Sequence, residues 1–117
     1  MKEARRLHES GDSQKAVAKL TRAIALEPRN PELFQLRAEA YFSLKDYYSS
    51  IINFQKVISL EPDTEDEIVE RLACVHYEYG TWLYDSGQFT QALEMFEKTS
   101  EYQPENKEPI MRRYYGD

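Results

Sequence analysis

Apolar residues recur along the chain at intervals of three and four positions, the spacing of helices that bury one face. Residues 13–27 show this pattern, with apolar side chains at Ala16, Val17, Leu20, Ala23 and Ile24. Prolines and short polar turns separate the patterned segments, because proline cannot continue a helical hydrogen-bond ladder. The pattern predicts an all-α chain of about seven helices, over residues 1–9, 13–27, 32–44, 47–60, 65–86, 89–102 and from about residue 109 onward.

The segment 31–64 contains one complete copy of a repeating unit. Its ending, Leu60-Glu61-Pro62, occurs upstream as Leu26-Glu27-Pro28 and downstream as Tyr102-Gln103-Pro104. The first two of these prolines lie 34 residues apart and the last two lie 42 apart, which is 34 plus an insertion of eight. A fixed period of this size indicates an array of stacked repeats.

Two short elements keep their register in all three units. The first combines a small residue with an apolar one or, in two units, an aromatic one four positions later: Ala16 and Leu20, Ser50 and Phe54, Ala92 and Phe96. The second combines a small residue with a larger one three positions later: Ala4 and Leu7, Ala38 and Tyr41, Gly80 and Leu83. Small residues at these positions let paired helices approach to roughly 8–10 Å, which larger side chains would prevent. We interpret them as a packing signal.

Together with the period, these elements resemble the tetratricopeptide repeat (TPR) family of helix–turn–helix units. The sequence departs from the family pattern at its first aromatic position, which is Phe34 in the middle unit but His76 in the third, and at the following leucine, replaced by Arg37 and Tyr79. The resemblance implies a TPR solenoid, a right-handed α-α superhelix of antiparallel helices. It implies one TPR domain over residues 1–117, with a truncated repeat 1 (1–30), repeat 2 (31–64), repeat 3 with an extended first helix (65–106) and the start of a fourth repeat (107–117). We interpret this array, cut inside repeats at both ends, as a fragment of a longer protein.

Eight extra residues lengthen the third unit. Thr64 and Glu67 form the signature of a capping box, which predicts a helix start at this point. An unbroken apolar stripe follows, so we expect one helix over 65–86; the alternative is a mobile acidic loop with a helix beginning near Leu72. The first two turns of the long helix would project past its neighbours and leave Ile68 and Leu72 partly exposed. These two residues would form a second contact surface.

The charge is distributed unevenly, and this limits the classes of partner. Residues 1–30 carry seven Lys/Arg against four Asp/Glu, whereas residues 31–117 carry eight against seventeen. The acidic balance disfavours nucleic acid, since phosphate binding needs clustered positive charge. No apolar run approaches the roughly 18 residues of a membrane span. The single cysteine, Cys74, allows no internal disulfide, and we expect an intracellular, cytoplasmic protein.

No catalytic, metal or cofactor site is expected. His8 and His76 lie in different units, and neither has a Ser, Cys or carboxylate in a recognisable nucleophile context. The acidic run after Pro62 is similar to a calcium loop, but Ile68 stands where such a loop needs glycine. Negative side chains at a helix N-terminus, where they oppose the helix dipole, explain the run more simply. We expect no enzyme activity and no cofactor.

In the TPR family the first helices of the repeats line a concave groove that binds peptides or helices of partner proteins. The resemblance therefore implies a protein–protein interaction module. The matching groove positions are Gln35, Glu39, Phe42 and Ser43 in the second unit, and Tyr77, Thr81, Tyr84 and Asp85 in the third. Aromatic side chains among polar ones suit such anchoring. The alternative is a purely structural solenoid segment in a large cytoskeletal or ciliary assembly.

Co-chaperone members of the family hold the C-terminal carboxylate of a chaperone with a lysine–asparagine clamp. The matching positions here are Met1, Arg5, Leu36, Cys74 and Glu78. Only Arg5 can bind a carboxylate, and Glu78 would repel one, so no binding of chaperone carboxylate tails is expected. The expected partner is another protein or peptide, with no nucleic acid and no membrane.

Overall fold

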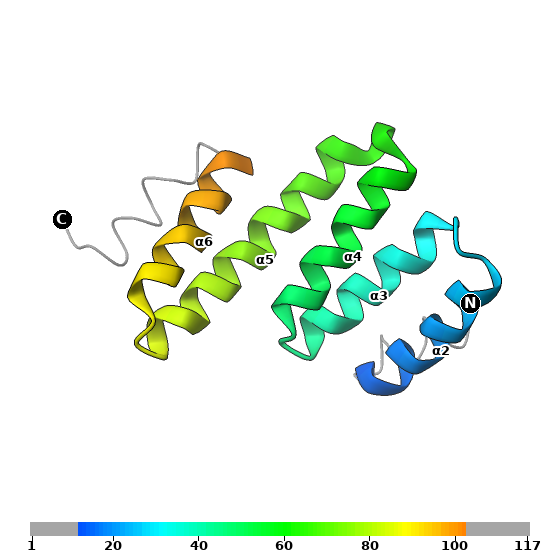
Figure 1. The fold of residues 1–117 in the computed structure, drawn as a ribbon, viewed down its shortest axis with the longest axis horizontal. Helices are drawn as coiled ribbons and strands as arrows, with labels where there is room; N and C mark the ends of the chain where they lie inside the picture. Colours follow the sequence, from blue (N-terminus) through cyan, green and yellow to red (C-terminus); the bar gives the residue numbers. More distant parts are fainter. Residues whose placement is uncertain (1–11, 103–117) are drawn as a thin grey trace. The chain divides into compact units, whose positions relative to one another are not determined.

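A computed structural model describes residues 12–102 of the 117-residue chain. The described part contains five α-helices, one short 3₁₀ helix and no strand (Figure 1). The helices are α2 (Ser13–Leu26), α3 (Pro31–Ser43), α4 (Tyr47–Leu60), α5 (Glu65–Asp85) and α6 (Phe89–Tyr102), and the 3₁₀ helix η1 is Pro62–Thr64. These bounds agree with the sequence prediction to within one residue. The predicted helices over 1–9 and from residue 109 lie outside the described residues, so a count of seven is not confirmed.

The chain divides into two compact units, Met1–Ile68 and Val69–Asp117, and their boundary falls inside α5. In the first unit α2 packs on α3, and α3 packs on α4. The helices α3 and α4 run antiparallel and are joined by a short turn (Figure 1). In the second unit α5 and α6 form another antiparallel pair (Figure 1). Each unit thus contains a helix hairpin of the kind that the repeat pattern predicts.

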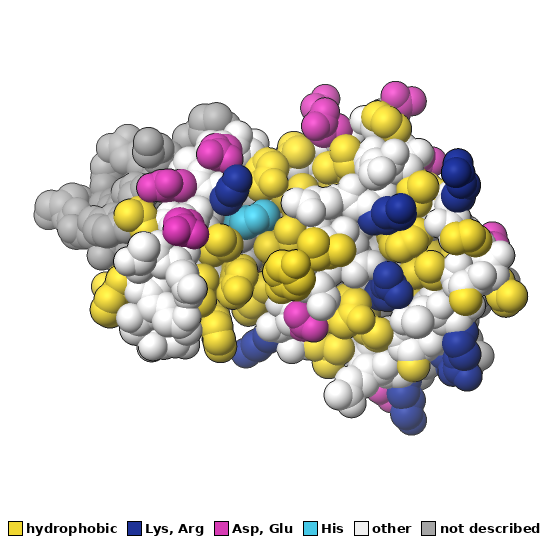
Figure 2. Space-filling model, viewed as in Figure 1, with side chains coloured by type: hydrophobic (Ala, Val, Ile, Leu, Met, Phe, Trp, Pro, Cys, Tyr) yellow, Lys and Arg dark blue, Asp and Glu magenta, His cyan; other side chains and the backbone are white. Residues whose placement is uncertain are grey.

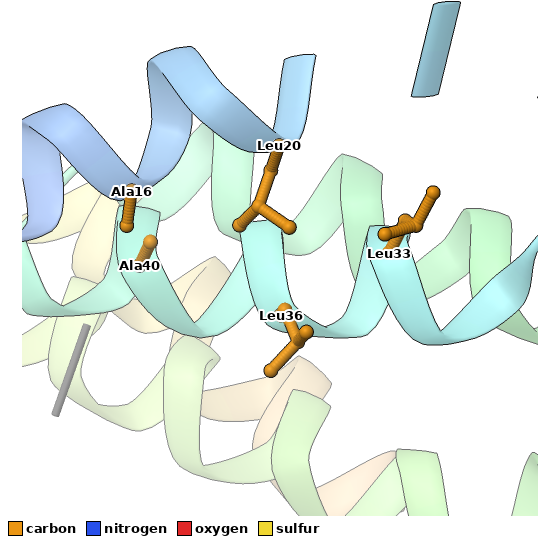
Figure 3. Packing of buried hydrophobic residues seen from close by; sticks show 5 residues of the cluster. All are labelled: Ala16, Leu20, Leu33, Leu36 and Ala40. Carbon is orange, nitrogen blue, oxygen red and sulfur yellow. The ribbon is translucent and has the colours of Figure 1, made fainter. Parts of the chain in front are cut away.

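The apolar core of the first unit includes a cluster between α2 and α3. Ala16 and Leu20 point from α2 toward α3, where Ala16 lies beside Ala40 (Figure 3). Leu33 and Leu36 of α3 complete the cluster, and four of the five side chains have no exposed surface. Burying a leucine side chain contributes about 1.5–3 kcal/mol, so this cluster is a major source of stability for the unit.

The small residues predicted to face one another do meet. In the first unit Ser50 and Ala38 are both fully buried, and the Ser50 hydroxyl donates a hydrogen bond of 2.9 Å to the Ala38 backbone carbonyl. In the second unit the hydroxyl of Thr99 donates to the Ala73 carbonyl at 3.3 Å. A side-chain hydroxyl reaches the backbone of a neighbouring helix only where the two helices lie close together, so the packing signal in the sequence is confirmed.

The helix starts confirm two expected features and contradict one. Asp46 caps α4 by accepting a hydrogen bond of 3.3 Å from the backbone N–H of Ser49, and Pro31 occupies the first turn of α3. For α2 we expected an oxygen of Asp12 or Ser13 as the cap. The Asp12 side chain makes no cap hydrogen bond; it lies 3.6 Å from the ammonium of Lys15. The Ser13 hydroxyl has no hydrogen-bond partner among the described residues.

The helices α3 and α5 end with the same hydrogen-bonded turn. At α3 the N–H of Lys45 donates to the Phe42 carbonyl and the N–H of Asp46 donates to the Tyr41 carbonyl, both at 2.9 Å. The same two bonds recur after α5, around Gly87. This turn needs one residue with positive φ, which is 85° at Gly87 and 63° at Lys45. The two residues are 42 positions apart, the same interval as between the last two repeat-ending prolines.

Replacing Lys45 by glycine is expected to raise the free energy of unfolding by about 0.5–1 kcal/mol. The left-handed conformation costs a side-chain-bearing residue roughly 1–2 kcal/mol. The greater flexibility of glycine in the unfolded chain offsets part of this gain. Gly87→Ala is the matched reciprocal change and should destabilise, since a Cβ at this position meets nothing within 4 Å and only the backbone strain counts. Urea unfolding of both variants checks this, and a loss of stability in Lys45→Gly would contradict it.

Candidate protein-binding surfaces

The second unit of the sequence places its predicted groove residues on one face of α3, a set that we call the α3 row. Gln35, Glu39, Phe42 and Ser43 follow one another at spacings of four, three and one, which brings them to one side of a helix. Ser43 is exposed and the other three are half-buried. The row thus combines an amide, a carboxylate, an aromatic ring and a hydroxyl on an accessible surface.

Local packing holds the α3 row in position. The ring of Phe42 contacts the buried ring of Tyr47 edge-on, with centroids 5.9 Å apart. At the other end of the helix, the side-chain oxygen of Asn30 accepts a hydrogen bond of 3.1 Å from the backbone N–H of Glu32. The helix is therefore fixed at both ends, so a ligand would meet side chains whose backbone is already ordered.

The third unit places its predicted groove residues on α5, a set that we call the α5 row: Tyr77, Thr81, Tyr84 and Asp85. The first three are half-buried and Asp85 is exposed. Tyr77 and Tyr84 both pack against the apolar cluster formed by Leu83, Ala92 and Phe96. The Tyr77 ring lies 5.9 Å from that of Phe96, and the Tyr84 ring lies 5.0 Å from that of Phe89. Both tyrosines therefore contribute to the packing of the second unit as well as to its surface.

The predicted second surface is wrong. The long helix exists as expected and begins at Glu65, but Ile68 and Leu72 are each only 1% exposed. The stripe that they begin lies on the buried side of α5, where it is removed from water. The capping box also differs, because the Thr64 hydroxyl donates to the Glu61 carbonyl at 2.7 Å. The insertion therefore lengthens the buried stripe and offers no exposed apolar patch at these two residues.

An arginine that sequence analysis noted only as a departure from the repeat pattern connects three helices. The Nε of Arg37 donates to the side-chain oxygen of Asn53 at 2.8 Å, and a terminal nitrogen donates to the Thr21 hydroxyl at 3.2 Å. Its guanidinium lies 5.5 Å from the ring centroid of Phe34. The amide of Asn53 donates in turn to the Ser49 carbonyl at 2.8 Å. Arg37 thus replaces the usual leucine with a polar link between α2, α3 and α4.

His76 occupies the aromatic position of the third unit and is buried, with 5% of its surface exposed. Its Nδ1 lies 2.8 Å from the Leu72 carbonyl; because a carbonyl only accepts, Nδ1 carries the proton. The ring lies 5.3 Å from that of Tyr102. Burial lowers the pKa of His76 below its ordinary value, and the nearby Lys98 adds to this, although the Leu72 carbonyl and Glu101 oppose it. The residue is a neutral packing group, as the pattern predicted.

The pKa of His76 makes the stability of the chain depend on pH. Because this pKa is lower in the folded chain than in the unfolded chain, protons bind more tightly to the unfolded form. The free energy of unfolding should therefore fall as the pH drops below about 6.5, the ordinary value for histidine. Thermal melts between pH 7.5 and 5.5 check this, with His76→Phe as the control that keeps an aromatic ring. An equally steep fall in the control would assign the effect to other groups.

The clamp positions offer no donor set for a carboxylate among the described residues. Leu36 belongs to the buried cluster between α2 and α3, and Glu78 is a half-buried acid. Burial and the Glu78 carboxylate raise the pKa of the Cys74 thiol, so it stays protonated at neutral pH. Met1 and Arg5 lie outside the described residues. The absence of chaperone-tail binding remains a prediction.

Residues 12–102 also contain no group of three or more His, Cys, Asp or Glu side chains placed to hold a metal ion. No helix in that range is long and apolar enough to cross a membrane. The features of this part of the chain that can recognise a ligand are therefore its side-chain surfaces. On the face seen in Figure 2, basic side chains lie mainly over α2–α4 and acidic ones are prominent over α6.

Comparison with known proteins gives the family of the central unit. Residues 31–64, the complete unit found from the period, match the family model for the tetratricopeptide repeat. The chain is 37% identical over 97 residues to tetratricopeptide repeat protein 16 of Homo sapiens, and 29% identical over 110 residues to tetratricopeptide repeat protein 13 of the same species. These matches cover 83% and 94% of this chain but only 11% and 12% of the relatives. The chain thus spans a small part of their length.

A solved structure shows the same fold. The crystal structure of MamA has a TM-score of 0.59 and 19% sequence identity to this chain, and the match covers 99% of this chain and 67% of that one. At this identity the likeness shows the fold alone. The chain therefore carries a tetratricopeptide repeat at residues 31–64, is homologous to tetratricopeptide repeat proteins 16 and 13, and has a TPR-like helical fold, as the sequence resemblance predicted.

Proposed function

We propose that the chain is a protein–protein interaction module that binds a peptide or helix of a partner protein along the α3 row. The observation that supports this most strongly is the α3 row itself: four side chains of different chemistry lie on one face of a helix whose two ends are fixed by Asn30 and by the Phe42–Tyr47 contact. TPR units generally serve protein interaction, which supports the same conclusion. The α5 row is proposed as a second binding surface of the same kind, on its own unit.

The polar groups of the two rows suggest the chemistry of the ligand. Glu39 and Asp85 contribute a carboxylate each, and neither row contains a lysine or arginine. Carboxylates form their strongest hydrogen bonds with charged donors such as guanidinium and ammonium groups. We therefore expect the bound segment to carry lysine or arginine beside an apolar side chain that contacts Phe42. Its affinity should fall with added salt, because exposed charge pairs are screened.

Site-specific photo-crosslinking tests the proposal and captures the partner in the same step. A benzoylphenylalanine is placed at position 35 or 39, and the full chain is irradiated in an extract of the source cells. As a matched control, the same group is placed at Gln14, an exposed residue of α2 outside both rows. We expect a discrete adduct from positions 35 and 39 and none from position 14. Equal adducts at all three positions would instead support a structural segment packed on several sides within an assembly.

A paired substitution then shows whether the row recognises the captured segment. Gln35→Ala with Glu39→Ala removes both polar groups and keeps a residue that favours helices. Gln14→Ala with Lys15→Ala is the control on α2, since both side chains are exposed. We expect the α3 variant to bind a synthetic copy of the segment about tenfold more weakly, as for loss of a charged hydrogen bond. An unchanged dissociation constant in the α3 variant would overturn the proposal.

A further inference from the structure

A second exposed row lies on the outer face of the first unit. Leu44, Tyr48 and Ile52 follow one another at intervals of four residues, the spacing of a row along a helix surface. They are 39%, 67% and 46% exposed, whereas α4 buries other apolar side chains such as Ile51, Phe54 and Val57. We call the three exposed residues the α4 row. None of them belongs to the α3 row.

The charges around the α4 row have one sign. The helix α4 contains no Asp or Glu, and its one charged residue is Lys56, which continues the row four positions beyond Ile52. Lys45, which is also exposed, stands at the other end beside Leu44. The neighbouring carboxylate of Asp46 is already used, since it accepts bonds from the N–H and the hydroxyl of Ser49 at 3.3 and 2.9 Å. The row is therefore apolar with a cation at each end, in a chain with a net charge of −6.

This arrangement specifies the chemistry of a complementary surface. A tyrosine and two aliphatic side chains provide the kind of anchor that dominates binding energy at interfaces. The lysines are eleven positions apart in sequence, which corresponds to roughly 16 Å along a helix. A partner helix with an apolar stripe and an acidic residue near each end can cover the row and meet both ammonium groups. A basic helix would place like charges together, which is unfavourable.

We infer that the α4 row is a docking surface for an acidic amphipathic helix of a partner protein. The surface is on a different helix from the α3 row and takes a ligand of the opposite charge. A chain with both surfaces can hold two segments at once, a basic one on α3 and an acidic one on α4. This inference therefore goes beyond the proposed function and stands without it.

A pair of synthetic helical peptides tests the inference with the full chain. Both peptides are about 15 residues long and carry leucines at intervals of three and four; one has glutamates near both ends and the other has lysines there. Fluorescence anisotropy at low salt gives the two dissociation constants. We expect the acidic peptide to bind at least about tenfold more tightly than the basic one, because it alone can pair with the lysines. Equal affinity for the two peptides would overturn the inference.

Substitutions locate the binding on the α4 row. Tyr48→Ser with Ile52→Ser should weaken the acidic peptide about tenfold or more, since both anchors are lost. The matched control is Trp82→Ser, which removes a side chain of α5 that is 50% exposed, and it should leave the affinity unchanged. Lys45→Glu with Lys56→Glu should reverse the preference toward the basic peptide. Loss of binding in the control, or no loss in the α4 variant, would contradict the assignment.

Two further measurements separate this surface from the alternatives. The α3 variant, Gln35→Ala with Glu39→Ala, should bind the acidic peptide normally, so that a failure of the proposed function and a failure of this inference can be told apart. Sedimentation of the chain alone should show a monomer. A dimer that dissociates in Tyr48→Ser would mean that a second copy of the chain covers the row, which would overturn the inference.

Discussion

Replacing Phe96 by alanine is expected to lower the free energy of unfolding by about 3–5 kcal/mol, the range for a buried aromatic residue. Phe96 is 1% exposed and belongs to the cluster with Leu83 and Ala92. A Cβ added at Gly80 would lie 2.7 Å from the Phe96 ring, so the ring packs directly against the backbone of α5. Removing the ring leaves a cavity beside Gly80, and a glycine has no side chain to fill it.

Phe89→Ala is the matched control for this change. The residue has the same chemistry and lies on the same helix, but it is 59% exposed and contacts mainly the ring of Tyr84. Its loss should cost about 1 kcal/mol, the size of an aromatic pair with little additional burial. Urea unfolding monitored by circular dichroism gives both values. Similar losses in the two variants would mean that the packing of α5 against α6 is not as described.

Leu20→Ala is expected to cost about 2–5 kcal/mol, as for other fully buried leucines. The side chain has no exposed surface and points from α2 toward α3 in the cluster of the first unit (Figure 3). This is the position where the repeat pattern usually has phenylalanine. Neighbouring side chains such as Ile24 are only partly buried and can fill part of the cavity, so a value in the lower half of the range is expected.

Leu26→Ala provides the control for Leu20→Ala. The two leucines lie six positions apart on α2, but Leu26 is 85% exposed. Its replacement should change the free energy of unfolding by no more than about 0.5 kcal/mol, as for surface positions in general. Thermal or urea unfolding distinguishes the two changes. A large loss in Leu26→Ala, with little loss in Leu20→Ala, would contradict the assignment of the buried face of α2.

The sequence predicted the helices well because their determinants are local. Proline, capping residues and the spacing of apolar side chains act within a few positions of one another, so the bounds of α4 and α6 were obtained to the residue. The close approach at Ala38 and Ser50 was also predictable, because small residues recur at these two positions in every unit and small side chains let helices pack closely. What a period cannot give is the surroundings of a side chain outside the repeat, as the insertion shows. Ile68 and Leu72 were expected at the surface and are buried.

The binding surfaces were only partly predictable for a similar reason. The α3 row follows from repeat positions and lies on an accessible face, but Tyr77 and Tyr84 pack on α6 through contacts that depend on three-dimensional neighbours. The Arg37 network needed the positions of three helices. Its only signal in the sequence was an arginine in place of leucine. The exposed α4 row was not recognised, because an apolar residue every four positions on a helix usually indicates a buried face.

An NMR titration of the full chain with the segment captured at positions 35 and 39 shows where on the molecule this ligand binds. Binding along the α3 row predicts that the largest amide shifts fall on α3 around Glu39 and that shifts at the control residue Gln14 stay small. It also predicts that the shifts diminish in the variant Gln35→Ala with Glu39→Ala. Largest shifts on α2 or α6, unchanged by that variant, would contradict binding at the α3 row.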